Sequence, residues 1–192
     1  MAIKLQELSF SYGDQPVFDH FSLDLPDSGT VCLYGPSGCG KTTVLRLLAG
    51  LEKPETGRIE GVQGTTFSFV FQENRLLPWM SVYENVAAVL PKPWNNEQIE
   101  DSLAMVGLEQ ASRKLPGELS GGMQRRVAIA RALTYDGDVL LLDEPFNGLD
   151  MQLKQHMIGV ISQQYRNRLI VLVTHNQEEA HQMGATLIKM NA

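Results

Sequence analysis

Apolar and polar residues alternate along two stretches near the N-terminus, residues 3–10 and 17–25. A period of two is typical of a β-strand with one buried face. Between the stretches lie Tyr12, Gly13 and Asp14, which are residues typical of a turn. We therefore predict that the chain begins with a pair of antiparallel strands.

Beyond this pair, short apolar runs alternate with segments that have helical spacing. The apolar runs predict strands over residues 30–34, 65–71, 139–142, 169–173 and 186–190. Capping residues and helical spacing predict helices over residues 44–50, 81–90 and 95–106, from Ser120 onward, over 150–165 and from Asn176. This alternation predicts an α/β fold with a largely parallel sheet. We expect one domain over residues 1–192, in which residues 72–135 form a helical subdomain inserted in the α/β core.

Composition and charge narrow the possible classes of protein. Of the 192 residues, 43% are hydrophobic and 20% are charged, which is typical of a globular protein. The formal net charge of -6 argues against nucleic acid as a partner, because non-specific binding to it needs clustered positive charge. The longest aliphatic run, residues 169–173, is far shorter than the roughly 18 residues of a membrane span, and no secretory signal is visible. We expect a cytoplasmic protein in which Cys32 and Cys39 stay reduced and form no zinc site.

A glycine-rich segment lies directly after the strand predicted at 30–34 and directly before a helix. It fits the phosphate-binding pattern Gly-x-x-x-x-Gly-Lys-Ser/Thr of P-loop NTPases, and the candidate ATP-binding residues are Gly35, Pro36, Ser37, Gly38, Cys39, Gly40, Lys41, Thr42 and Thr43. Glycines let backbone N–H groups approach a β-phosphate, and the helix N-terminus adds positive potential. Lys41 would reach the β- and γ-phosphate oxygens, and the Thr42 hydroxyl would ligate Mg²⁺. An ordinary glycine turn is the alternative, which this setting disfavours.

Two adjacent acids, Asp143 and Glu144, follow the buried strand predicted at 139–142. Open α/β sheets bind their ligands at the carboxyl ends of parallel strands. Asp143 is suited to the Mg²⁺ shell opposite Thr42, and Glu144 is suited to polarising the water that attacks a phosphate. Two solvated charges at a strand end are the alternative, which the phosphate-binding segment weakens.

A second serine-glycine loop, residues 119–124, begins the helix expected from Ser120. Its free N–H groups and helix dipole would bind a second anion. Taken alone, the loop is better explained by a serine cap followed by flexible glycines. Two candidate anion sites in one chain therefore need an explanation.

With these three elements in this order, the chain resembles the nucleotide-binding subunits of ABC transporters over nearly its whole length. Residues 119–123 match the signature loop of that family, which is more specific than the phosphate-binding segment. The resemblance implies that Tyr12 stacks on adenine, that Gln72 senses Mg²⁺ and the catalytic water, and that His175 holds the γ-phosphate. It also implies that Asp150 contacts a partner subunit, and that the partner's ATP is bound by Ser120, Gly121, Gly122 and Met123.

Each of these residues also has a structural alternative. Tyr12 would pack within its turn, Gln72 would be a polar loop residue, and Asp150 would only cap the helix that follows it. An isolated histidine such as His175, placed after a buried strand, is more often structural. Their joint occurrence in the order of the family favours the functional interpretation.

The resemblance also implies how the protein works. Two subunits pair head to tail, as a homodimer, so that each ATP with its Mg²⁺ lies between the phosphate loop of one copy and the signature loop of the other. A single copy would bind ATP and hydrolyse it poorly. The dimer would power a separate integral membrane permease from the inner face of the cell membrane, served by a substrate-binding protein.

The segment 71–80 places Leu76, Leu77, Trp79 and Met80 on a polar-flanked loop, where exposed apolar groups indicate a docking surface. In ABC transporters this region receives a helix of the permease. The alternative for Leu76 and Leu77 is packing within the helical segment. The run resembles importers of nitrate, sulfonate and taurine and of related thiamine-precursor type, which implies uptake of a small anion.

The sequence departs from the family in two ways. Met123 stands where the signature usually has glutamine, and the sequence ends at Ala192 without the additional C-terminal elements of many relatives. We therefore expect no regulatory domain after the last strand. The alternative function is a soluble ABC-type ATPase in DNA repair, translation or complex assembly, although no coiled coil, paired ATPase unit or basic surface is visible. A P-loop kinase would leave the signature loop and His175 unexplained.

Overall fold

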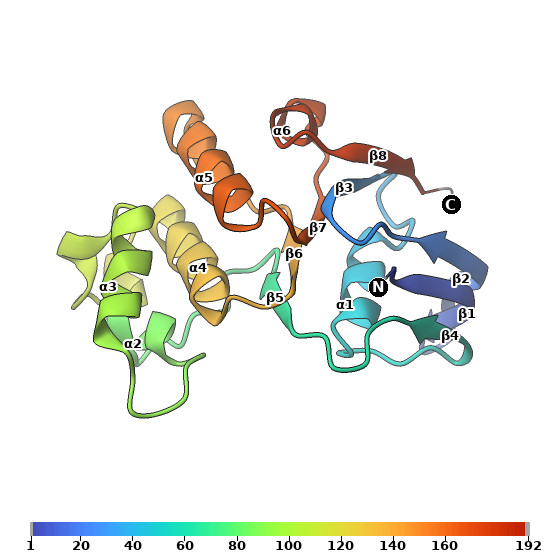
Figure 1. Ribbon diagram of the computed structural model, residues 1–192, viewed down its shortest axis with the longest axis horizontal. Coiled ribbons are helices and arrows are strands. Elements are labelled where there is room, and N and C mark those ends of the chain that lie inside the picture. The colour runs from blue at the N-terminus through green and yellow to red at the C-terminus, as the bar shows by residue number, and fades with distance from the viewer. Residues whose placement is uncertain (1, 191–192) are drawn as a thin grey trace.

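The computed structural model describes residues 2–190. Strands and helices alternate one by one over residues 121–189, whereas strands or helices follow one another in groups before that (Figure 1). In chain order they are β1 (Lys4–Tyr12), β2 (Gln15–Asp24), β3 (Gly29–Tyr34), α1 (Lys41–Leu48), β4 (Thr56–Glu60), β5 (Phe67–Val70), α2 (Val82–Ala87), α3 (Asn96–Met105), the 3-10 turns η1 (Glu109–Ala111) and η2 (Pro116–Glu118), α4 (Gly121–Tyr135), β6 (Val139–Asp143), α5 (Met151–Gln164), β7 (Leu169–Val173), α6 (Gln177–Gln182) and β8 (Thr186–Lys189).

The larger sheet is parallel and has the strand order β5-β6-β7-β3-β8. Its central strands β6 and β7 are buried along their whole length, as their continuous apolar sequences predict. The α/β fold with a largely parallel sheet is thereby confirmed. The strands carry the site, because their carboxyl ends meet at a common edge.

A second, antiparallel sheet has the order β2-β1-β4. The N-terminal pair predicted from the alternating pattern is therefore confirmed. The third strand, β4, was not predicted, because Ile59 is the single aliphatic residue in the sequence Thr-Gly-Arg-Ile-Glu and most of the strand is exposed. Its pairing with β1 is a long-range contact that leaves no hydrophobic period in the sequence.

The capped helices begin close to where their caps predict, and several helices end one to three residues before the predicted limit. Ser81 and Glu84 form the predicted capping box of α2, which ends at Ala87 although the pattern predicted a helix to about residue 90. The next helix, α3, is capped by Asn95 and ends one residue before the predicted limit. The turns η1 and η2 between α3 and α4 were not predicted, because such short segments have no hydrophobic period.

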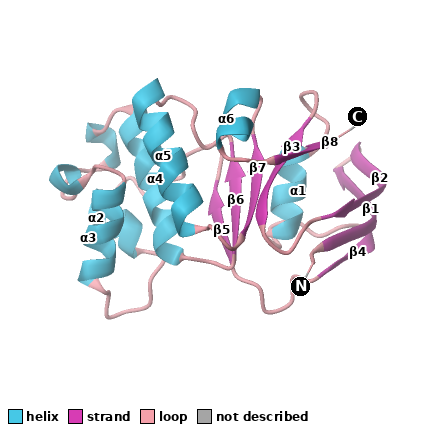
Figure 2. Ribbon diagram, turned by 45° about the horizontal axis from the view of Figure 1, so that its top comes forward, coloured by secondary structure: helices cyan, strands magenta, loops and turns pink. Residues whose placement is uncertain are grey.

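Two apolar cores lie on opposite faces of the parallel sheet. Along β6, Leu140 and Leu142 belong to the core shared with α4, α5 and α6, and Leu141 belongs to the core shared with α1 and the antiparallel sheet. The helices α2, α3 and α4 lie together at the end of the molecule away from β1, β2 and β4 (Figures 1 and 2). Among residues 2–190, no helix is long and apolar enough to span a bilayer.

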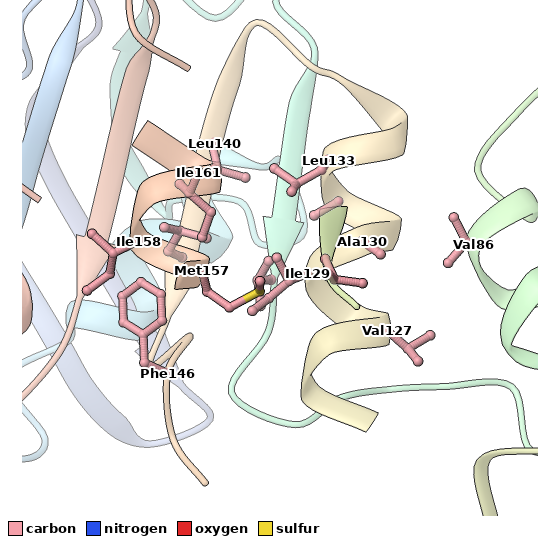
Figure 3. Close-up of a cluster of buried hydrophobic side chains, with 14 of the residues drawn as sticks. Val86, Val127, Ile129, Ala130, Leu133, Leu140, Phe146, Met157, Ile158 and Ile161 are labelled. Atoms are coloured by element: carbon pink, nitrogen blue, oxygen red, sulfur yellow. The ribbon is translucent and has the colours of Figure 1, made fainter. Parts of the chain in front are cut away.

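Helix α4 joins the two parts of the larger core. Ile129 points toward Met157 of α5, whereas Val127 points toward Val86 of α2 (Figure 3). All four side chains are fully buried. The helix that begins with the signature loop is thus packed against both the helical group and the parallel sheet.

Candidate nucleotide-binding site

The candidate site residues lie at the carboxyl edge of the parallel sheet. The phosphate loop follows β3, Asp143 ends β6, and His175 follows β7. These three strands are neighbours in the order β6-β7-β3 and run in the same direction. Residues that are far apart in the sequence are therefore brought together where an open α/β sheet binds its ligand.

The phosphate loop has a backbone that requires glycine. Gly38 and Gly40 have φ angles of +86° and +89°, which side chains rarely tolerate. A Cβ atom on Gly40 would also collide with the ring of Phe18. Gly40 is the N-cap of α1, and no side chain caps this helix, so its first N–H groups remain available to an anion.

Lys41 is held over this loop by the loop itself. Its Nζ donates to the carbonyl oxygens of Gly35 at 2.9 Å and Pro36 at 2.8 Å, and it lies 3.7 Å from Cys39 Sγ. The Cys39 side chain is buried beneath the loop. The Lys41 ammonium group is therefore bound by backbone carbonyl oxygens, and phosphate oxygens can take their place as its hydrogen-bond acceptors.

A pocket of about 270 Å³ opens beside the loop, and it is lined by Tyr12, Gln15, Val17, Gly38, Gly40, Lys41, Thr42 and Thr43. Tyr12 is half-exposed at its rim, and the Tyr12 hydroxyl accepts a hydrogen bond of 3.2 Å from Arg46. The Tyr12 ring also packs edge-on against Phe10, with ring centroids 4.9 Å apart. Tyr12 thus packs near its turn, which was its structural alternative, and it borders the phosphate pocket; its stacking on adenine stays a prediction.

Thr42 and Asp143 form the pair of oxygen donors that fits a magnesium ion. Thr42 Oγ1 donates to Asp143 Oδ1 at 3.2 Å, and Asp143 is 2% exposed. Burial raises the pKa of the Asp143 carboxyl, an effect that the hydrogen bond from Thr42 partly opposes. Hydroxyl and carboxylate oxygens are ligands that Mg²⁺ prefers, and a divalent cation would stabilise the buried carboxylate.

Gln72 reaches the site by its backbone. Its side chain is exposed, and its carbonyl oxygen accepts a hydrogen bond of 3.2 Å from Arg125. No hydrogen bond joins the Gln72 amide to Thr42 or Asp143. Within residues 2–190 there is also no group of three His, Cys, Asp or Glu side chains that could hold a metal, so any magnesium site here depends on hydroxyl and amide donors as well as a carboxylate.

Glu144 and His175 form a contact across the ends of β6 and β7. His175 Nδ1 lies 3.0 Å from Glu144 Oε1. Glu144 has a φ of +49°, and its N–H donates to the carbonyl of Val173 at 2.9 Å. A non-glycine residue in this region is strained, and such residues cluster at functional sites.

The two oxygens of Glu144 differ in their surroundings. Oε1 forms the hydrogen bond with His175 Nδ1, whereas Oε2 is buried, lies 3.0 Å from the same nitrogen and makes no hydrogen bond among the described residues. The hydrogen bond with Glu144, and then its charge, raises the pKa of the exposed His175 side chain. The His175 ring therefore faces both oxygens of Glu144, and Oε2 keeps its capacity to accept a hydrogen bond.

A buried ion pair supports the loop that carries His175. Glu179 is 3% exposed; it accepts from Lys154 Nζ at 2.6 Å through Oε1 and from Thr174 Oγ1 at 2.6 Å through Oε2. Thr174 Oγ1 also accepts from the Asn176 N–H at 3.1 Å. No pattern in the sequence predicts Lys154 or this role of Thr174, because their contacts join α5, α6 and the end of β7.

The signature loop begins α4; its Ser120 and Gly121 are exposed, whereas Leu119 is buried and Met123 packs against the larger core. Ser120 Oγ accepts a hydrogen bond of 3.3 Å from the Met123 N–H, which makes Ser120 the N-cap that its sequence also predicts. Gly122 lies against the loop that contains Gly148. The signature loop thus starts in the helical group, whereas the phosphate loop starts α1 near the antiparallel sheet (Figure 1).

Asp150 has the structural role that was its alternative. It is the N-cap of α5, and its Oδ1 accepts from the Leu153 N–H at 2.9 Å. Its contact with a partner subunit stays a prediction, since one chain is described. The Asp150 side chain is nevertheless exposed, on the loop that follows Gly148.

The loop of residues 71–81 divides its apolar side chains between core and surface. Leu76 packs against the larger core, which is its predicted alternative, while Trp79 is 71% exposed. Asn85, fully buried, donates to the carbonyls of Leu77 and Met80 at 3.1 and 2.9 Å and accepts from the Leu77 N–H at 2.8 Å. This polar residue inside an apolar helix face holds the loop in place.

The profile of a family described as "ABC transporter" matches residues 18–147, which is more than half of the chain. The chain belongs to the ABC transporter family. Its cassette is 43% identical to the spermidine/putrescine import ATP-binding protein PotA of Marinobacter nauticus, over 97% of this chain and 54% of that protein. It is 42% identical to the aliphatic sulfonates import ATP-binding protein SsuB 2 of Frankia alni, over 97% of this chain and 76% of that protein.

Solved structures agree with this family. The cassette superimposes on MJ0796, described as a bacterial ABC transporter cassette in a dimeric structure, with a TM-score of 0.87, 26% identity and coverage of 97% and 94% of the two chains. A post-hydrolysis dimer of the same protein bound to ADP and Pi gives a TM-score of 0.86 at 25% identity, over 98% and 94% of the chains. The cassette spans little more than half the length of the PotA relative.

Proposed function

We propose that this cassette binds and hydrolyses ATP as the motor subunit of an ABC importer. The observation that carries the proposal is the convergence of the phosphate loop, Asp143, Glu144 and His175 at one edge of the parallel sheet. The relatives named as import ATP-binding proteins support it, since they match nearly the whole chain.

The residues divide the work between binding and proton transfer. Lys41 and the free N–H groups at the start of α1 bind the phosphates. Thr42 and Asp143 would hold Mg²⁺, with the Gln72 amide as a further ligand, and the ion would neutralise charge that develops on the transferred phosphoryl group. The Glu144 carboxylate accepts a hydrogen bond and then the proton of the attacking water. His175 fixes the orientation of Glu144 through the 3.0 Å contact and places its exposed ring near the γ-phosphate.

The catalytic unit is a head-to-tail homodimer in this proposal. The signature residues Ser120–Met123 begin α4, where the Ser120 hydroxyl caps the Met123 N–H, and the remaining N–H groups of this helix start suit the phosphates bound by a second copy. Asp150 lies on the loop beside Gly148 and Gly122, at the surface that would face that copy. The dimeric structures of MJ0796 support the pairing of two copies.

A groove next to the loop of residues 71–81 is the proposed docking site for a permease. It has a volume of about 440 Å³ and is lined by Phe67, Ser68, Phe69, Phe71, Arg75, Leu77, Ala88, Val89, Arg131, Ala132 and Tyr135. Trp79 and Tyr135, 71% and 44% exposed, are large side chains that a membrane subunit could cover. Arg75 lies over the Phe71 ring at 4.1 Å and, with Arg131, provides cations in this mainly apolar surface.

The imported substrate is a finer part of the proposal. Relatives of similar identity are named for spermidine and putrescine, for Fe(3+) ions, for aliphatic sulfonates and for sulfate and thiosulfate. We favour a small anion of the nitrate, sulfonate or taurine type, supported by the resemblance of residues 71–80 and by the SsuB 2 match. The cassette would act at the cytoplasmic face of the membrane, with a substrate-binding protein on the other side.

Detergent extraction tests whether a permease is the partner. The tagged cassette, expressed in its own cells, should co-purify with one multi-span membrane protein, and Trp79→Asp should lose that protein. Leu51→Asp is the matched control, because Leu51 is also apolar and 53% exposed but lies beyond α1. An active ATPase that retains no membrane protein would instead favour a soluble ABC-type ATPase of repair, translation or complex assembly.

A further inference from the structure

Arg125 is a buried cation that the sequence analysis did not single out. It lies in the second turn of α4, directly after the signature loop, and is 2% exposed. Burial lowers the pKa of its guanidinium to about 10, so the group is still charged at neutral pH. A buried charge is costly unless its hydrogen bonds are satisfied, so its contacts need an explanation.

The guanidinium binds the end of β6 with one side of its fork. Nε donates to the Pro145 carbonyl at 2.8 Å, and Nη2 donates to the carbonyls of Asp143 and Glu144 at 2.9 and 2.5 Å. Arg125 thereby holds three consecutive carbonyls around the strained backbone of Glu144. The planar fork of arginine suits this arrangement, whereas a lysine ammonium has no such fork.

The other side of the fork binds the loop that carries Gln72. Nη1 donates to the carbonyls of Phe71 and Gln72 at 2.5 and 3.2 Å, and to Asn74 Oδ1 at 3.3 Å. The same helix binds this loop a second time, because Arg131 donates to the Asn74 carbonyl at 3.0 Å. One side chain of α4 therefore joins two segments that are about 70 residues apart in sequence.

We propose that Arg125 is a positioning residue that fixes the Gln72 loop and the backbone of Glu144 to the signature helix. The proposal rests on the catalytic roles proposed above for Gln72 and Glu144. Since α4 begins at Ser120, a shift of the signature loop toward a second copy would move the Glu144 and Gln72 backbones with it. Closure of the dimer would therefore also bring the catalytic carboxylate into place.

The test replaces the fork and keeps the rest of the site. Arg125→Lys retains the charge, and Arg125→Gln retains hydrogen-bonding capacity, but neither can bind both segments. We expect kcat to fall by about 10- to 100-fold, because small displacements of catalytic groups have effects of this size. The dissociation constant for ATP, measured with the separate monomer, should stay within about twofold, because Arg125 touches no residue of the phosphate loop.

Arg126→Lys is the matched control. Arg126 is the next residue of α4, and its Nη1 donates to the carbonyls of Val106 and Gly107 at 2.7 and 2.9 Å, away from the catalytic residues. Arg126→Lys should lower the melting temperature by no more than Arg125→Lys does. Its kcat should stay within about twofold of the value for the unchanged protein. All assays are run well below the lowest melting temperature, so that loss of folded protein does not enter kcat.

The outcomes separate this proposal from the function on which it rests. If Glu144→Gln turns over ATP at the normal rate, the assignment of Glu144 fails. If Glu144→Gln is inactive and folded Arg125→Lys keeps the normal kcat, the role of Arg125 is overturned. The role of Arg125 would also be overturned if Arg125→Lys and Arg126→Lys were equally stable and lost the same amount of kcat. The effect would then come from the helix in general.

Discussion

The buried pair of Lys154 and Glu179 makes a quantitative prediction about the support of His175. The bridge is 2.6 Å long, and the side chains are 19% and 4% exposed. Removing one partner of a buried pair costs about 3–5 kcal/mol, because the other charge is left without compensation. Water can reach the Lys154 end, so we expect Lys154→Met to lower the free energy of unfolding by about 3 kcal/mol.

The double variant should recover most of that loss. Glu179→Gln keeps a partner for the Thr174 hydroxyl and leaves an ammonium that can turn to solvent, which should cost about 1 kcal/mol. Lys154→Met combined with Glu179→Gln leaves no buried charge and should also cost about 1 kcal/mol. The two single changes would then sum to about 3 kcal/mol more than the double variant.

Urea unfolding followed by circular dichroism measures these differences, with equal slopes required for a valid comparison. Lys4→Met is the control, since its pair with Asp24 is 3.7 Å long and exposed on both sides, and should change stability by less than about 1 kcal/mol. The coupling is refuted if the summed effects of the two single changes equal the effect of the double variant to within about 0.5 kcal/mol, because uncoupled residues behave in that way.

Four further predictions concern the site. Glu144→Gln should preserve ATP binding and lower turnover by about 100-fold or more. It should also favour an ATP-bound dimer, which size-exclusion chromatography with ATP would detect. Normal turnover would assign the base to another residue. Gly40→Ala should destabilise the fold by more than about 1 kcal/mol in thermal unfolding, because Gly40 has a φ of +89°. Gly159→Ala should stabilise the fold by about 0.4–1 kcal/mol, because Gly159 lies in α5 with open space around it. Equal effects of the two changes would contradict this. A bulky thiol reagent on the buried Cys39 should block nucleotide binding, and unchanged ATP affinity after verified modification would refute that. NMR titration should find the pKa of His175 above its ordinary value of about 6.5, and Glu144→Gln should lower it. The pair stabilises the fold at low pH and loses that contribution as the pH rises through the raised pKa of His175. An unchanged His175 pKa in Glu144→Gln would contradict the pairing.

Elements with a strong pattern were predicted from the sequence. β6 and β7 are continuous apolar runs buried on both faces, and Ser81, Ser120 and Asp150 each begin a helix as N-caps. β4 was missed because it is mostly exposed and paired by its backbone to β1. Local pattern records burial and capping, but it does not record strand pairing at the edge of a sheet.

The same difference applies to the site. The phosphate loop, Asp143 and Glu144 could be predicted because contiguous residues carry their chemistry. Arg125, by contrast, acts through backbone carbonyls, which have no sequence signature, and its partners lie about 20 and 50 positions away. An arginine at the start of an otherwise apolar helix face was the one available signal, and the charged surface of the helix was the simpler explanation for it.

The dependence of ATPase activity on protein concentration tests the central claim most directly. The range of concentration should span the dissociation of the dimer, located by analytical ultracentrifugation of Glu144→Gln with ATP. Because the proposed site takes Ser120 and its glycines from a second copy, the rate per subunit should rise with concentration and reach a plateau once the dimer is formed. A rate per subunit that stays constant through the dissociation range would contradict a site shared between two copies.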